Sequence, residues 1–295
     1  MRAYEIYQEY EEDKYQTSTQ KKVKNVLAEA KQEGILPHPE TTNLQEAKEI
    51  LQENFLGPEA LKTTFNIECH NIPNIPFSTA ELHRAKELNQ YLILRVSQTE
   101  QGQPLTMQTM QTILKTDKTL YNTDWYKNEP FFTQETPQLS WALVSKEPIP
   151  NSTNKNYLKQ TETIIDYITN QVFKDQPLPP EYQEAIAQFN NEKSTIEPII
   201  SSNWQEAAKQ LENLKITQLT RQTPVEILYD LLMNLKANNQ RLLESKYTWS
   251  ARRSSDGYLV SVGSFVAFGA GVFRFGPVSS YGGLVVSFSR SGVVN

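Results

Sequence analysis

The chain has 295 residues, with 29 lysines and arginines against 34 aspartates and glutamates and a formal charge of −5. This length allows a sizeable core in one or two domains. The acidic balance gives no support for nucleic-acid binding, which needs clustered positive charge.

The content of asparagine, glutamine, lysine and threonine suggests a microbial cytoplasmic protein, and three features bear on its compartment. Residues 1–14 hold many acids and no apolar run, unlike a conventional signal peptide. Cys69 is the only cysteine, so no intrachain disulfide can form. Residues 257–273 are uncharged, but their glycines, serines and strict alternation favour a pair of strands over a membrane helix. We therefore expect no transmembrane helix and no membrane contact.

Residues 1–57 are expected to form an N-terminal helical hairpin or arm. An amphipathic, heavily charged helix is predicted over residues 21–32. A second begins at the capping box Asn43 to Glu46 and stops before Gly57.

Residues 58–220 are expected to form a central α+β body. Ser78 and Glu81 form a capping box, which is the best local signal of a helix start in the chain. The alternation of helical and strand patterns gives the following expected order: a short strand 63–70, the helix after Ser78, a strand 91–96, a helix 106–115, a strand 139–146, a helix 155–173, a helix opened by Pro179-Pro180, and a helix opened by a capping box at Ser202 to Gln205.

Residues 221–295 are expected to form a helix followed by a β-sheet module, which possibly continues the body as one domain. Thr223, Pro224 and Glu226 mark the helix start, and a wide apolar stripe follows. Large and small residues then alternate from Tyr258 to Gly269 and again over 284–289, separated by Gly-rich turns. The fold class is therefore α+β: a mainly helical body with a few central strands, and a C-terminal antiparallel meander packed on a helix.

No motif identifies a reaction, and the catalytic residues are unknown. The histidines His38, His70 and His83 stand at no metal-ligand spacing, and no nucleotide-binding motif is complete. The sequence therefore predicts neither a metal nor a cofactor. Arg252 and Arg253, together with Lys246, form a small basic cluster that is either exposed or meets an acidic partner.

Three places are candidate ligand contacts, each with a structural alternative. Arg95 is a charge in an apolar strand, so it either contacts a ligand or is neutralised by a buried partner. Trp125 and Tyr126 lie in an aromatic segment that either lines a groove or forms a satellite core. Ser152, Thr153 and Lys155 precede a helix, where they either bind an anion or only cap the helix.

The function indicated first is that of a non-catalytic interaction or assembly protein. It would bind a protein partner, or a second copy of itself, through its C-terminal β module or its aromatic loop. The alternative is a transferase or hydrolase acting on a phosphorylated or nucleotide-like ligand, with Arg95 and residues 151–155 at its site.

Overall fold

The computed structural model describes residues 41–114, 119–121 and 124–292. The expected helix over 21–32 and most of the predicted N-terminal arm lie outside these residues. The described elements follow one another in this order: α3 (Leu44–Leu51), η1 (Gln52–Asn54), β1 (Phe55–Leu56), α4 (Pro58–Phe65), α5 (Thr79–Glu87), β2 (Gln90–Arg95), α6 (Met107–Leu114), β3 (Leu120–Tyr121), α7 (Pro130–Thr133), β4 (Ser140–Ser145), α8 (Tyr157–Tyr167), the π-helical turn η2 (Ile168–Val172), α9 (Pro180–Ile196), α10 (Ile199–Ser202), α11 (Trp204–Asn213), α12 (Lys215–Thr220), α13 (Pro224–Asn238), β5 (Tyr247–Arg253), β6 (Leu259–Val266), β7 (Gly269–Phe275), β8 (Leu284–Val285) and β9 (Ser289–Gly292).

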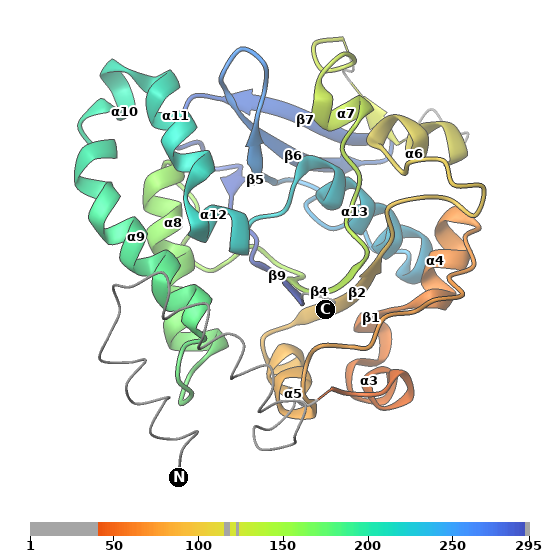
Figure 1. Ribbon diagram of the computed structural model, residues 1–295. Helices are drawn as coiled ribbons and strands as arrows, with labels where there is room; N and C mark the ends of the chain where they lie inside the picture. Colours follow the sequence, from red (N-terminus) through yellow and green to blue (C-terminus); the bar gives the residue numbers. More distant parts are fainter. Residues whose placement is uncertain (1–40, 115–118, 122–123, 293–295) are drawn as a thin grey trace, which may run out of the picture.

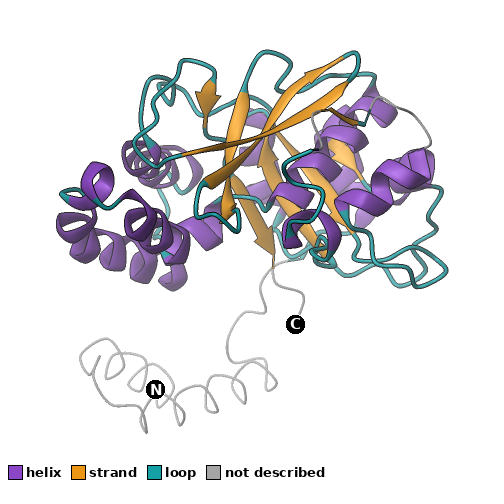
Figure 2. Ribbon diagram, turned by 90° about the horizontal axis from the view of Figure 1, so that it is seen from above, coloured by secondary structure: helices purple, strands orange, loops and turns teal. Residues whose placement is uncertain are grey.

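The strands form two sheets, and the fold is α+β as predicted. One sheet has the order β1-β2-β4-β9 and the other has the order β3-β7-β6-β5-β8. In the second sheet β5, β6 and β7 form the expected antiparallel meander. The short strands β3 and β8 extend it with parallel pairing at the two edges. Figure 2 shows the strands in the middle of the molecule with helices on both sides.

The predicted strand over 284–289 is divided between the two sheets. β8 pairs with β5, whereas β9 pairs antiparallel with β4 and thereby joins the sheet of β2. Between them the backbone N–H of Val286 donates to Ser152 Oγ at 3.5 Å, and that of Ser287 donates to Thr248 Oγ1 at 2.9 Å. These side-chain acceptors replace ladder partners, which lets the chain leave one sheet for the other.

Both faces of the meander are covered. Val260 and Val262 share one core with Leu228 and Leu232 of α13, as expected for a helix next to the sheet in sequence. Trp249 on the opposite face belongs to a second core, built mainly from α8, α9, α11 and α12. In Figure 1 these four helices lie to the left of the strands, whereas α4 and α6 lie to the right and α5 lies below.

Two local predictions were wrong. Residues 63–65 end helix α4, which begins with Pro58 at its first position, so no strand runs over 63–70. Ser202 does not cap α11. It is the last residue of α10, its hydroxyl donates to the Pro198 carbonyl at 3.3 Å, and α11 begins at Trp204. In both places a helix extends into residues where the sequence had predicted the start of another element.

The start of α13 follows the predicted capping box. Thr223 Oγ1 accepts from the Glu226 N–H, and Glu226 Oε2 accepts from the Thr223 N–H at 2.8 Å. We expect Thr223→Ala to lower the free energy of unfolding by about 1–2 kcal/mol, because the Glu226 N–H loses its side-chain acceptor. Chemical denaturation measures this effect. Thr112→Ala, at an exposed position of α6, is the control, and an equal effect of both substitutions would contradict the assignment.

Candidate functional site

A cleft of about 820 Å³ is lined by residues of both cores and is the candidate site. Ligand pockets typically measure about 300–1,000 Å³. Its walls come from six separate places: the start of α5, the loop before β4, the start of α9, the segment from α12 to α13, β5, and β9. Its lining includes the side chains of four glutamates and three arginines, Glu81, Glu135, Glu181, Glu226, Arg221, Arg252 and Arg290.

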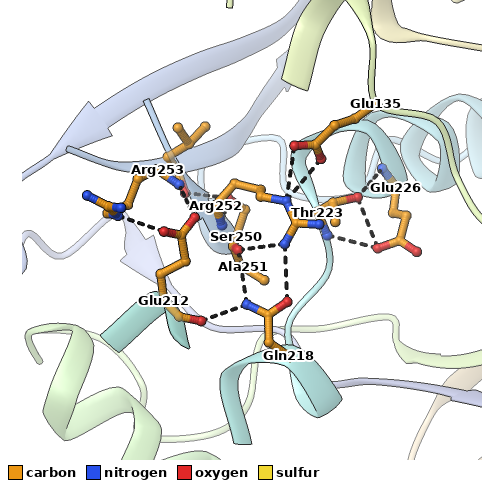
Figure 3. A network of polar contacts seen from close by, with 10 residues as sticks. Glu135, Glu212, Gln218, Thr223, Glu226, Ser250, Ala251, Arg252 and Arg253 are labelled. Atoms are coloured by element: carbon orange, nitrogen blue, oxygen red, sulfur yellow. Dashed lines mark hydrogen bonds and ion pairs between the residues drawn. The ribbon is translucent and has the colours of Figure 1, made fainter. Parts of the chain in front are cut away.

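Arg252 is the centre of the polar network drawn in Figure 3. Its Nε lies 3.1 Å from both carboxylate oxygens of Glu135, and its Nη1 donates to Gln218 Oε1 at 3.1 Å. Burial raises the pKa of Glu135, and the neighbouring Arg252 charge only partly opposes that effect. On the other side of the strand, Arg253 donates to Glu212. The two arginines of the predicted basic cluster are therefore paired with carboxylates of the same chain, whereas Lys246 donates to the Gly282 carbonyl.

Glu226 connects the cleft to a buried ion pair. Its Oε1 lies 3.2 Å from Arg95 Nη1, while Arg95 Nε and Nη2 donate to the two carboxylate oxygens of Asp230 at 3.1 and 2.7 Å. Asp230 also accepts from Tyr91 and Gln222. Burial alone would lower the pKa of Arg95, but the charges of Asp230 and Glu226 raise it above its usual value. Arg95 thus holds Glu226 in place from behind the cleft wall.

Arg221 differs from the other two arginines of the cleft because its charge is not compensated. Its side chain is buried, and its guanidinium carbon lies 3.9 Å from the ring centroid of Tyr157. Nη2 donates to the Tyr157 carbonyl and to Thr161 Oγ1, whereas Nε and Nη1 have no hydrogen-bond partner among the described residues. Burial lowers the pKa of Arg221. Arginine nevertheless stays protonated in proteins, so a positive charge without a carboxylate partner is buried beside the cleft that Arg221 helps to line.

Arg290 of β9 is paired with Glu81 at the start of α5. Its guanidinium also lies over the rings of Phe77 and Phe173. Burial alone would raise the pKa of Glu81, but the charge of Arg290 and the Ser78 backbone hydrogen bond lower it below its usual value. This pair ties the last described strand to the α5 helix.

The lowered pKa of Glu81 gives a pH-dependent prediction. The pair contributes stability above the unfolded-state pKa of about 4.3, and that contribution is lost as the pH falls through the folded-state pKa. We expect wild type to be more stable than Glu81→Gln at neutral pH, with a difference that shrinks below about pH 4.3. Urea denaturation across pH measures it. Glu184→Gln, from an exposed pair with Lys215, should show little difference throughout, and a gap for Glu81→Gln that ignores pH would refute the role of the pair.

The residues predicted from sequence lie in three separate environments. Arg95 is fully buried in its ion pair, which is the structural alternative stated above. Trp125 Nε1 donates to the Val272 carbonyl at 3.2 Å. Tyr126 is buried, and its hydroxyl donates to the Tyr121 carbonyl.

The third predicted place is the entry to α8. Ser152 is buried against Val286, Thr153 is exposed, and Lys155 Nζ donates to Thr163 Oγ1 at 2.8 Å. The cap of α8 is Asn156 rather than these residues. The cleft is lined by none of the six predicted residues, and ligand binding by them stays a prediction.

Sequence reasoning missed Arg221, Glu135 and Arg290. Each is a charge at the edge of a local element, and charges at such positions are ordinarily solvated. No local pattern could indicate the burial of Arg221, because Tyr157 and Thr161 are about 60 residues away in sequence.

Two further findings concern the described residues alone. No group of three or more histidine, cysteine, aspartate or glutamate side chains is arranged there to hold a metal ion. None of the described helices is both long and apolar enough to cross a membrane.

Comparison with protein family models, with curated proteins and with solved structures finds no match to this chain. The chemistry of the cleft is therefore the basis for a functional proposal.

Proposed function

We propose that the protein is a non-catalytic binding protein that holds an anionic group of its ligand or partner against Arg221. The observation that carries this proposal is the buried Arg221 guanidinium, which has no carboxylate partner and belongs to a residue that lines a cleft of ligand size. A buried charge without a partner costs several kcal/mol of stability. A bound anion would supply the missing counter-charge, and the two free N–H groups suit a carboxylate or phosphate oxygen.

The other charges of the cleft support a ligand with one anionic group. Arg252 and Arg290 are already paired with Glu135 and Glu81, so neither is free to take a second anion without breaking its pair. The proposal keeps the expected binding role of the C-terminal strands, because β5 and β9 supply these two arginines.

Titration with inorganic phosphate and with acetate, at constant ionic strength, tests this proposal. Small anions carry few atoms, so we expect a dissociation constant on the order of 1 mM by calorimetry, accompanied by a concentration-dependent rise in Tm. Arg221→Gln should weaken binding at least tenfold. Arg253→Gln, next to the cleft residue Arg252 but outside the cleft lining, is the matched control. Equal binding by wild type and Arg221→Gln would remove the proposal.

A further inference from the structure

The edge of β9 that does not pair with β4 lies in the same cleft as Arg221, with α12 close to β9. β9 is the last strand of its sheet, and β4 occupies only one side of it. The Ser145 N–H donates to the Phe288 carbonyl at 2.9 Å, which fixes the alternation of the antiparallel ladder. With Leu143 opposite Arg290 and Val144 opposite Ser289, the backbone groups of Ser289 and Ser291 therefore point away from β4.

On that side, these backbone groups have no hydrogen-bond partner among the described residues. Ser289 and Ser291 both line the cleft; Ser291 is exposed, whereas Ser289 is only 4% exposed. An unpaired strand edge is a ready template for another extended segment. Free backbone donors and acceptors thus stand in the same cleft as one free cation.

The remaining walls combine apolar side chains with carboxylates. Phe77, Tyr182 and Leu219 line the cleft from three different elements and offer apolar surface to side chains of a ligand. Glu135, Glu181 and Glu226 would repel a polyanion such as a nucleic acid or a polyphosphate. The lining therefore suits a ligand with a main chain, apolar side chains and a single negative charge.

We propose that the cleft binds an extended peptide segment with a free C-terminal carboxylate. The carboxylate approaches the Arg221 side chain from the cleft, and the main chain pairs with Ser289 and Ser291 as an added strand. Strand addition gives affinity through backbone hydrogen bonds, and side-chain pockets give selectivity. This inference rests on the proposed anion-binding function and names its ligand class.

Affinity selection on the full chain tests the inference. The protein is incubated with a pool of random pentapeptides bearing free carboxylates, or with the same pool amidated at the C-terminus. Retained peptides are identified by mass spectrometry after gel filtration, and the dissociation constants of synthetic copies are then measured. We expect amidation to weaken the selected peptides at least tenfold. Selection of both pools with equal affinity would overturn the inference.

Two variants separate the backbone edge from the cation. Ser291→Pro removes an N–H that has no described partner, and proline is tolerated on edge strands. It should abolish peptide binding yet leave phosphate binding unchanged, while Ser291→Ala should bind both. If Ser291→Pro does not fold, selected peptides with N-methylated backbones replace it and should lose binding at least tenfold.

The outcomes distinguish the two proposals. Phosphate binding through Arg221 without any retained peptide overturns the peptide inference and leaves the anion site in place. Absence of both phosphate and peptide binding overturns both. Peptide binding that survives Ser291→Pro and backbone methylation overturns strand addition.

Discussion

Replacing Asp230 with alanine is expected to lower the free energy of unfolding by about 3–5 kcal/mol, because a buried charge then loses its partner. Arg95 is fully buried, and Asp230 accepts two of its hydrogen bonds as well as those of Tyr91 and Gln222. A loss of this size is a large part of the total stability of a typical domain, which is about 5–15 kcal/mol. Urea denaturation followed by circular dichroism measures it.

Two controls test whether the cause is the stranded Arg95 charge. Asp256→Ala breaks a partly exposed pair with Arg274, and its expected cost is below about 1 kcal/mol. The double replacement Arg95→Met with Asp230→Leu removes both charges and should recover most of the lost stability. A cost below about 1 kcal/mol for Asp230→Ala would show that the pair is not a principal support of the fold.

Replacing Arg221 with methionine is expected to have the opposite sign. Removal of an uncompensated buried charge should raise the free energy of unfolding by about 1 kcal/mol, because the desolvation cost exceeds the two hydrogen bonds that are lost. The same substitution should abolish phosphate binding. Such an exchange of stability for binding is characteristic of a residue retained for function.

The matched control for Arg221→Met is Arg290→Met. Arg290 compensates Glu81, so its removal leaves a partly buried carboxylate without a partner and should be destabilising. Thermal and chemical denaturation of both variants give the comparison. A large destabilisation by Arg221→Met would assign its guanidinium to the core and leave the anion site without its main support.

Local signals in the sequence predicted the elements that depend on neighbouring residues. The capping boxes of α5 and α13 need only residues three apart, and both form as expected. The alternation around Val260 is a property of one strand and its register, and the meander follows it. The sequence alone was therefore sufficient to predict the α+β class.

Features that depend on distant partners were not predictable. Arg95 stood out as a charge in an apolar strand, but its partner Asp230 lies 135 residues away, in a helix that the sequence indicated as an apolar cover. The cleft likewise needs contributions from six segments, and no periodicity encodes their meeting. The division of residues 284–292 between two sheets depends on acceptors from Ser152 and Thr248, which the alternation pattern does not contain.

The pairing of β9 with β4 also constrains the order of events during folding. The partners Leu143 and Arg290 are far apart in the chain, so the β1-β2-β4-β9 sheet gains its last strand only after β5 to β8 have been synthesised. Closing so large a loop costs entropy before the stabilising hydrogen bonds of the ladder form, and such topologies fold slowly. During synthesis on the ribosome, one edge of β4 would accordingly stay unpaired until β9 emerges. A chaperone that shields such edges would raise the yield of the native state.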